Sequence, residues 1–187
     1  IEFTPRRCGE WYVSDTRFGP LSHAALDARA ENSGKLVTTV RKEAKRIAEE
    51  RKAAWIIVDG SPGTGCPVIA SITGADAVVI VTEPTKSGQH DLERVASLAR
   101  HVALPFSVVV NKADINQTMA DETASWCSRN GVPFLGMIPY DRAVTKAQIQ
   151  GLSVIEFQAI HDDAEIRKQE ITDVISGIWE RICQLKR

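Results

Sequence analysis

The chain has 187 residues, of which 43% are hydrophobic and 25% are charged. This length and composition predict one soluble globular domain over residues 1–187 that buries a core of its own. The net charge is −1, from 23 basic and 24 acidic residues, which excludes a global electrostatic attraction to nucleic acid or to an anionic membrane. No apolar run reaches the roughly 18 to 20 residues of a membrane-spanning helix, and no charged-then-apolar leader opens the chain, so we expect neither a membrane span nor export.

The hydrophobic pattern predicts alternating strands and helices. In chain order we expect first a strand at 10–18, an amphipathic helix over 32–52 and a strand at 53–59. A strand at 75–83, a helix near 92–102 and a strand at 105–114 follow. The chain then continues with a helix at 118–130 that opens with a Thr-x-x-Asp cap, a weaker strand at 132–139 and a closing helix at 171–185. The strands at 53–59, 75–83 and 105–114 are continuous and β-branched, which is typical of strands buried on both faces. The pattern therefore predicts an α/β fold of three layers, with a mostly parallel sheet and helices on both faces.

The cysteines are widely spaced and form no C-x-x-C pair; they are Cys8, Cys66, Cys127 and Cys183. This spacing predicts neither a zinc site nor an iron–sulfur cluster in this chain, and it favours a reduced, cytoplasmic protein. Cys66 follows a glycine turn near a predicted helix start, which is a setting that lowers the pKa of a thiol. The nearest histidine in sequence is His90, so we favour a packing role for Cys66 over a nucleophilic one.

Residues 58–71, VDGSPGTGCPVIAS, contain two glycines with the spacing of a phosphate-binding P-loop. That loop requires G-x-x-x-x-G-K-[ST], in which the lysine reaches the phosphates and the hydroxyl holds Mg²⁺. Here Cys66 and Pro67 stand at those two positions. Proline also removes a backbone donor, so we interpret this stretch as something other than a phosphate cradle.

Ligands of open α/β sheets bind outside the carboxyl ends of the strands, so the residues that follow each strand are the candidate site. Asp59 follows the predicted strand at 53–59 and can hold Mg²⁺ through its water shell, while the backbone of Gly63 can approach a terminal phosphate. The alternative is that Asp59 caps the next helix and the glycines form a tight turn.

The sequence Asn-Lys-Ala-Asp at 111–114 also follows a predicted strand. Asn-Lys-x-Asp at that place is typical of the guanine-reading loop of GTPases, in which the Asp accepts hydrogen bonds from the base. A polar turn at the end of a strand explains the same four residues.

Three segments together, at 16–45, 59–95 and 107–116, resemble the MinD/ParA-type (CobQ/CobB/MinD/ParA) P-loop ATPases, in the subgroup that carries an inserted ferredoxin domain. The likeness runs from about Gly9 to Gly151. It implies a P-loop NTPase-like fold, ATP hydrolysis, ATP and Mg²⁺ as ligands, and a homodimer that forms around the nucleotide.

The resemblance also implies roles for single residues. Asp59 corresponds to the Walker B aspartate, which contacts Mg²⁺ through water, and Pro62, Gly63 and Thr64 correspond to the switch II turn. We thus expect Asp59 and Gly63 to be the catalytic residues. The nucleotide-binding residues implied are Asn111, Lys112, Asp114, Pro139 and Asp141.

Two elements of the resembled family are absent from these 187 residues: the opening strand with its K-G-G-x-G-K-[ST] loop, and the cysteine-rich ferredoxin segment. The stretch ENSGKL at 31–36 does not replace the loop, because Arg29 stands in place of the first glycine and Leu36 in place of the hydroxyl. The chain therefore resembles the C-terminal portion of such a protein. Since the P-loop supplies most of the positioning and charge stabilisation, we expect weak nucleotide affinity and negligible hydrolysis from this chain alone.

Relatives usually show Asn-Arg-Tyr-Asp where this chain has Asn-Lys-Ala-Asp, which keeps GTP open as an alternative to ATP. We favour ATP because the rest of the chain resembles ATPases. The predicted function is the nucleotide-binding portion of an ATPase associated with iron–sulfur or redox chemistry. The alternative is a non-catalytic binding or assembly module on the same fold, in which an unpaired strand edge promotes self-association.

Overall fold

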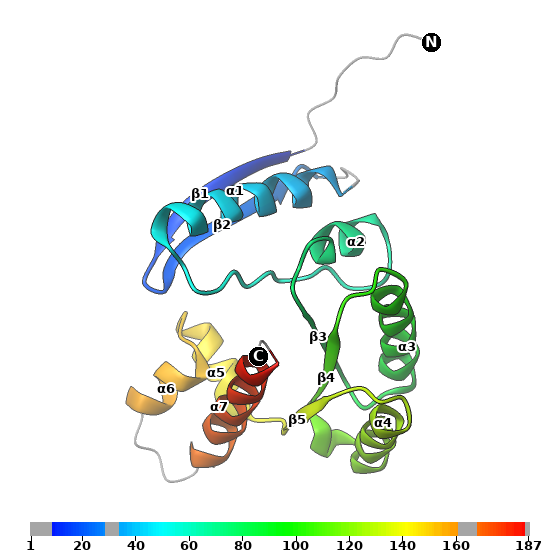
Figure 1. Cartoon of the computed structure of the whole chain (residues 1–187). Helices are drawn as coiled ribbons and strands as arrows, with labels where there is room; N and C mark the ends of the chain where they lie inside the picture. Colours follow the sequence, from blue (N-terminus) through cyan, green and yellow to red (C-terminus); the bar gives the residue numbers. More distant parts are fainter. Residues whose placement is uncertain (1–8, 29–33, 161–167, 186–187) are drawn as a thin grey trace. The chain divides into compact units, whose positions relative to one another are not determined.

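The computed structural model describes residues 9–28, 34–160 and 168–185 (Figure 1). The chain divides into two compact units, Ile1–Asp76 and Ala77–Arg187, and each is described by itself. The prediction of one domain over residues 1–187 stays a prediction. Within the described ranges, no helix is both long enough and apolar enough to cross a membrane.

The first unit begins with an antiparallel hairpin of β1 (Gly9–Thr16) and β2 (Gly19–Leu26). The strand predicted at 10–18 is confirmed, and β2 is an addition that the sequence analysis missed. Tyr12 lies directly opposite His23, and their rings stack with centroids 5.4 Å apart. Cross-strand pairs of this kind stabilise a two-stranded ribbon, which is marginal in isolation.

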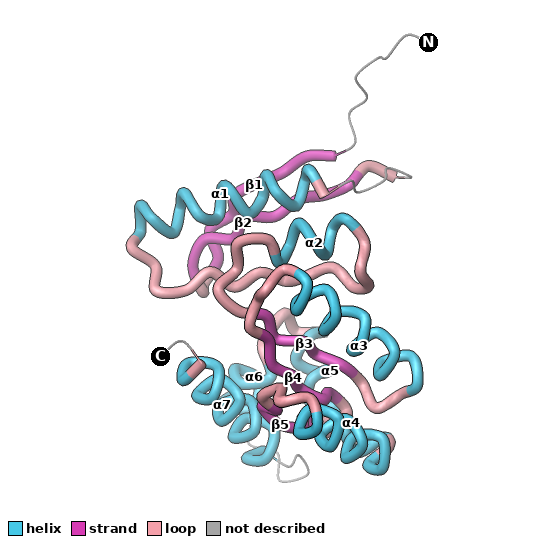
Figure 2. Tube along the Cα trace, turned by 45° about the vertical axis from the view of Figure 1, so that its right-hand side comes forward, coloured by secondary structure: helices cyan, strands magenta, loops and turns pink. Residues whose placement is uncertain are grey.

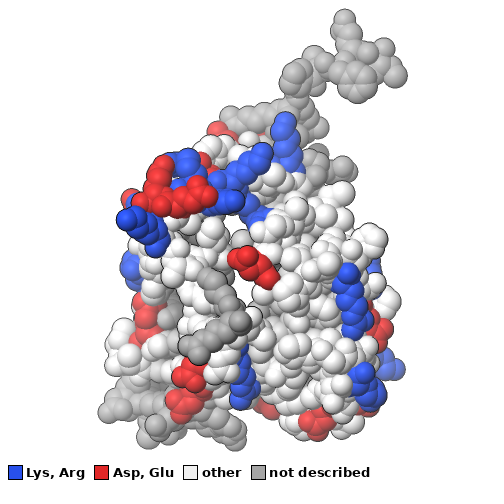
Figure 3. Space-filling model, viewed as in Figure 1, with Lys and Arg blue, Asp and Glu red and all other residues white. Residues whose placement is uncertain are grey.

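Helix α1 (Lys35–Arg51) packs against the hairpin and confirms the helix predicted at 32–52. The Ser22 hydroxyl donates to the carbonyl oxygen of Val40 at 3.0 Å, which ties β2 to the helix. On the solvent side, Arg46 pairs with Glu43 and Glu50. The hydrogen bond from Arg46 lowers the pKa of the Glu43 carboxyl, and Figure 3 shows acidic and basic side chains interspersed over this helix.

Helix α2 (Cys66–Ile72) packs on α1 in the same unit. Arg41 of α1 donates from Nη1 to the carbonyl oxygen of Ala70 at 3.0 Å. Gly34 precedes α1 with φ +81°, and a Cβ at this position would lie 3.0 Å from the carbonyl oxygen of Cys66. The close approach of the two helices therefore requires glycine here.

The strand predicted at 53–59 is wrong. Residues 55–61 form no strand, and the apolar side chains of the segment are exposed: Ile57 is 79% exposed and Ile56 is 47% exposed. The reason is that a strand requires a hydrogen-bonding neighbour, and no described strand pairs with this segment. Its β-branched composition alone does not form a sheet.

The second unit contains a parallel sheet in the order β3-β4-β5. Its strands are β3 (Val78–Thr82), β4 (Phe106–Asn111) and β5 (Phe134–Ile138), which confirm the predicted strands at 75–83, 105–114 and 132–139. The central strand β4 is buried on both faces, with Val108 and Val109 at 0% and 2% exposure. Among the described strands none pairs with the outer edge of β3, where Val81 is 62% exposed.

Helices cover both faces of this sheet, as predicted (Figures 1 and 2). On one face lie α3 (Lys86–His101) and α4 (Gln117–Arg129). On the other lies α7 (Lys168–Gln184), which confirms the predicted closing helix. The core of the first face is formed by Ile80, Leu92, Ala96, Val108, Cys127 and Val132, and that of the second by Val109, Leu135 and Ile178.

The cap predicted for the helix at 118–130 is wrong, although the helix is confirmed. Asn116 caps α4, because its Oδ1 accepts a hydrogen bond from the backbone N–H of Met119 at 3.2 Å. Asparagine is among the best N-cap residues, and it places Thr118 inside the first turn. A short 3-10 helix, η1 (Ala113–Ile115), precedes this cap.

Two further helices, α5 (Arg142–Ile149) and α6 (Val154–Ile160), were not predicted. They bury Phe157 against Ala143 and Ala147.

The pairing of β4 with β5 shifts register between Val108 and Val109. Gly136 lies at this irregularity with φ +145°, a conformation that favours glycine. A Cβ on Gly136 would lie 3.3 Å from Nη1 of Arg181 and 3.4 Å from Cγ1 of Ile178, both on α7. Arg181 donates to the carbonyl oxygen of Leu135, so α7 is attached to the sheet at this point.

Candidate functional site

The loops at the carboxyl ends of β3, β4 and β5 carry one group of predicted site residues. These loops belong to the second unit, and the parallel pairing of the strands places their ends at one edge of the sheet. Asn111 is the last residue of β4 and Lys112 follows it, Pro139 and Asp141 follow β5, and Asp114 lies in η1. The site predicted from the strand ends therefore gathers five of its residues at this edge, as open α/β sheets require.

Asp114 joins two of these loops. Its Oδ1 accepts a hydrogen bond from the backbone N–H of Tyr140 at 2.6 Å, across 26 positions of sequence. A hydrogen bond to a carboxylate is stronger than one between neutral groups. Asp114 therefore fixes the loop after β5 relative to the loop after β4.

Lys112 joins the loops after β3 and β4. Its Nζ lies 2.7 Å from Oε1 of Glu83, and the two side chains are 39% and 46% exposed. The backbone of Lys112 is left-handed, with φ +55°, which is uncommon for a residue other than glycine. Oδ1 of Asn111 accepts from the backbone N–H of Lys112 at 3.0 Å, so the turn after β4 is held by its own side chains.

The loops after β5 and β3 each lead into a helix that is capped by a side chain. Oδ1 of Asp141 accepts from the backbone N–H of Ala143 at 2.7 Å and caps α5. Oγ1 of Thr85 accepts from the N–H of Gly88 at 3.0 Å and caps α3. Each cap satisfies a backbone donor that the helix leaves unpaired. These contacts leave Pro139 half-buried and Tyr140 exposed at the rim of the site.

The second group of predicted residues lies in the first unit, in the segment between α1 and α2. Asp59 is exposed, and Pro62, Gly63 and Thr64 lie in the turn that precedes α2. Gly63 has φ +85°, and a Cβ built on it would meet no heavy atom within 4 Å. Glycine is required here by backbone conformation, and the space beside it is open.

Asp59 offers one exposed carboxylate to a metal ion. Mg²⁺ usually keeps several waters and binds through one or two carboxylates together with substrate phosphates. Within the described residues, no group of three or more His, Cys, Asp or Glu side chains is placed to hold a metal by itself. Among the described residues, Asp59 therefore does not form a metal site by itself.

Sequence reasoning missed Glu83 and Tyr140 as parts of the site. Glu83 lies in the stretch TEPTKSG, and Tyr140 in IPYD, so both stretches were recognised as strand ends. Their contacts join residues 29 and 26 positions apart. Only the order of the strands in the sheet brings such residues together, and local sequence patterns do not predict this order.

No protein-family profile matches the sequence. Uncharacterized protein MJ0579 of Methanocaldococcus jannaschii is 26% identical over 165 residues, which cover 88% of this chain and 55% of that protein. The iron-sulfur cluster carrier protein of Pyrococcus horikoshii is 26% identical over 139 residues, which cover 67% of this chain and 46% of that protein. The chain thus spans about half the length of these curated relatives.

The solved structures that this chain is similar to include MinD proteins. The cell division ATPase MinD of Pyrococcus furiosus gives a TM-score of 0.60 at 18% identity, covering 84% of this chain and 63% of that one. MinD of Pyrococcus horikoshii, complexed with Mg-ADP, gives 0.58 at 16% identity, covering 87% and 62%. The chain therefore has the MinD-type P-loop NTPase-like fold, as the resemblance implied.

Proposed function

We propose that this chain is the Mg²⁺-dependent, ATP-binding portion of a MinD/ParA-like ATPase that serves iron–sulfur or redox chemistry in the cytoplasm. The observation that carries the proposal is the cross-linked group of loops at the carboxyl edge of the β3-β4-β5 sheet, where Asp114 holds the loop of Tyr140. A rigid polar edge of this kind is where open α/β sheets bind nucleotides. The link to iron–sulfur chemistry is supported by the carrier proteins among the relatives.

The contacts of Asp114 favour adenine over guanine as the base. A carboxylate that reads guanine must offer two acceptor oxygens to the two donors of the base. Here Oδ1 of Asp114 already accepts from the Tyr140 N–H at 2.6 Å. We assign Asp114 and Lys112 to the support of the loops, and Asn111 to the hydrogen bond with adenine. Pro139 and Asp141 then flank the base and the ribose.

The phosphate-facing role falls to the first unit. Asp59 would contact the magnesium shell, and the Pro62-Gly63-Thr64 turn would sense the terminal phosphate. These 187 residues contain no G-x-x-x-x-G-K-[ST] sequence, so in this proposal hydrolysis and tight binding require a phosphate-binding loop from elsewhere. Bound Mg²⁺ would neutralise phosphate charge, while this chain positions the base and the water shell.

The proposal is tested by NMR titration of the ¹⁵N-labelled chain with Mg·ATP and, separately, with Mg·GTP. NMR detects the weak affinity expected here. We expect ATP to move the backbone signals of Asn111, Tyr140 and Asp141 at lower concentration than GTP does. No phosphate release above background is expected in either mixture.

Two variants make the test specific. Asn111→Ala should remove the preference for ATP, because the amide that would bind adenine is lost. Asn130→Ala is the matched control, since Asn130 lies in the loop that precedes β5, at the other end of the sheet. Signals at the carboxyl edge that stay unchanged with both nucleotides, or a response to Asn130→Ala equal to that of Asn111→Ala, would contradict the proposal.

A second candidate is a non-catalytic assembly module that self-associates, and one observation favours it. Residues 55–58 expose four consecutive apolar side chains, and the outer edge of β3 has no partner strand among those described. Exposed apolar segments and free sheet edges promote association between copies. Such pairing would be a form of self-association other than the nucleotide-bridged homodimer that the family resemblance implied.

Sedimentation of the chain at micromolar concentration tests this candidate. Self-association that Ile57→Lys weakens supports it. Ile149→Lys is the matched control, since Ile149 is 81% exposed and Ile57 is 79% exposed. A monomer at these concentrations, or equal effects of the two variants, would contradict it.

A further inference from the structure

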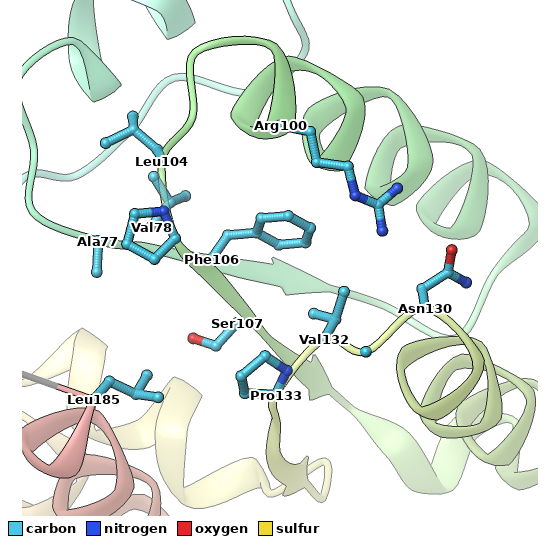
Figure 4. Close-up of a pocket in the computed structure, with 12 residues that line it drawn as sticks. Ala77, Val78, Arg100, Leu104, Phe106, Ser107, Asn130, Val132, Pro133 and Leu185 are labelled. Atoms are coloured by element: carbon cyan, nitrogen blue, oxygen red, sulfur yellow. The ribbon is translucent and has the colours of Figure 1, made fainter.

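A cavity of about 340 Å³ opens at the amino ends of the strands, away from the loops of the candidate nucleotide site (Figure 4). It is formed by the first residues of β3 and β4, the two loops that lead into β4 and β5, the last turn of α3 and the end of α7. All of these parts belong to the second unit. The volume lies near the lower limit of small-molecule pockets in proteins.

The lining combines apolar walls with a single charge. The apolar side chains are Ala77, Val78, Leu104, Pro105, Phe106, Val132, Pro133 and Leu185. Among the described residues of the lining, Arg100 is the one that is charged, and none is acidic. An apolar surface with one uncompensated cation suits a ligand that has an apolar body and one negative charge.

The position of Arg100 is fixed by aromatic rings. Its guanidinium carbon lies 5.6 Å from the centroid of the Phe106 ring and 5.9 Å from that of Trp126. Cation–π contacts at these distances hold the group over the rings and leave the edges of the guanidinium free for a carboxylate. Figure 4 shows Arg100 extending from α3 above the start of β4.

The cavity wall also contains an unsatisfied polar group. The Ser107 hydroxyl is buried, with the residue only 1% exposed, and it has no hydrogen-bond partner among the described residues. Alternation along β4 directs Ser107 to the face opposite Phe106, and Figure 4 shows its oxygen on the side of Leu185. Buried hydroxyls are normally paired, so Ser107 is an unusual polar feature of the cavity wall, on the face of the sheet away from Arg100.

We infer that this amino-edge cavity binds a small monocarboxylate with an apolar body. The carboxylate pairs with Arg100, and the apolar part covers the starts of the strands between Phe106 and Pro133. The site differs from the nucleotide site in position and in ligand chemistry, and it does not depend on the proposed function.

Octanoate is the probe, and octanamide is its uncharged counterpart. In an NMR titration of the ¹⁵N-labelled chain, octanoate should move the backbone signals of Ser107, Gly131 and Val132. Octanamide should bind about tenfold more weakly, since a charge-assisted hydrogen bond is lost. The signals of Asn111 and Tyr140 at the opposite edge should stay in place.

Two variants separate a specific site from general apolar binding. Arg100→Gln should weaken octanoate about tenfold, and the matched control Arg94→Gln, on the same helix but outside the lining, should leave it unchanged. Ala77→Phe fills the cavity from an exposed position and should abolish binding while every charge is retained.

Equal affinities for octanoate and octanamide would overturn the inference. So would equal effects of Arg100→Gln and Arg94→Gln, or full binding by Ala77→Phe. The dispersion of the NMR spectrum confirms that each variant is folded.

Discussion

The two regions that carry the predicted site residues are built differently. At the carboxyl edge of β3-β4-β5, each loop is held by a side chain: Asp114 holds Tyr140, Lys112 holds Glu83 and Asp141 caps α5. In the segment between α1 and α2, residues 55–61 form no strand, and Asp59 is exposed. Polar contacts between the loops of neighbouring strands fix the first region, whereas no described strand pairs with the second.

The difference shows what each region requires. The loops at the carboxyl edge of β3-β4-β5 depend only on strands that the described residues contain. The segment at 55–61 has the composition of a central strand, but central strands depend on pairing along both edges. Three measurements test this difference between the two regions.

The largest expected difference lies in stability. Leu92→Ala removes a side chain that is 1% exposed in the core between α3 and the sheet, and should lower the free energy of unfolding by about 3 kcal/mol. Ile57→Ala, in the exposed segment, should change it by less than about 0.5 kcal/mol. Urea denaturation followed by far-UV circular dichroism measures both. A cost for Ile57→Ala close to that of Leu92→Ala would show that the segment packs in solution.

A smaller effect is expected where Asp114 joins the loops. Asp114→Ala removes the acceptor of the Tyr140 N–H and should cost about 1 kcal/mol, because the bond is exposed. Asp114→Asn keeps an acceptor oxygen and should restore most of the loss. Asp59→Ala is the control from the other region and should be neutral. Hydrogen exchange of the Tyr140 amide reports the same bond directly, and unchanged protection in Asp114→Ala would refute its role.

The smallest expected effect is a difference in thiol reactivity between Cys66 and Cys127. Burial raises the pKa of the Cys127 thiol to about 11, and Cys66 is exposed at the start of α2. At pH 8 iodoacetamide should therefore label Cys66 and leave Cys127 unmodified, as peptide mass spectrometry would show. Labelling of Cys127 at a rate near that of Cys66 would mean that the core around α4 opens readily.

The same shift has a consequence for stability. The ordinary pKa of the thiol is 9.0, so the unfolded chain loses this proton before the folded one does. The contribution of Cys127 is complete below pH 9 and is lost as the pH rises towards 11. Cys127→Ala should remove this decline.

Much of the second unit could be predicted from the sequence because its determinants are local. The β-branched runs of β3 and β4 and the apolar stripe of α3 each indicate one element, and the strand ends then indicate Asn111 and Asp114. The segment at 53–59 has the same local signal and failed, because a ladder partner is a property of the whole fold. The contacts of Glu83 and Tyr140 were missed for the same reason.

Caps and short helices show a finer limit. Thr118 and Asn116 are both good N-cap residues, two positions apart, and propensity does not choose between them. The 3-10 turn at Ala113–Ile115 decides the matter, because it ends at Asn116 and directs that side chain to the N–H of Met119. The boundary of α4 is thus set by the turn before it.

Gly136 in β5 and the inner surface of α7 are expected to change together in evolution. Any side chain there would meet Ile178 and Arg181 of α7 within 3.4 Å. A relative that replaces this glycine must also change the inner surface of the closing helix, or move it. Substitutions at these positions should therefore occur together among relatives. A relative with a larger residue at position 136 should have a smaller one at position 178.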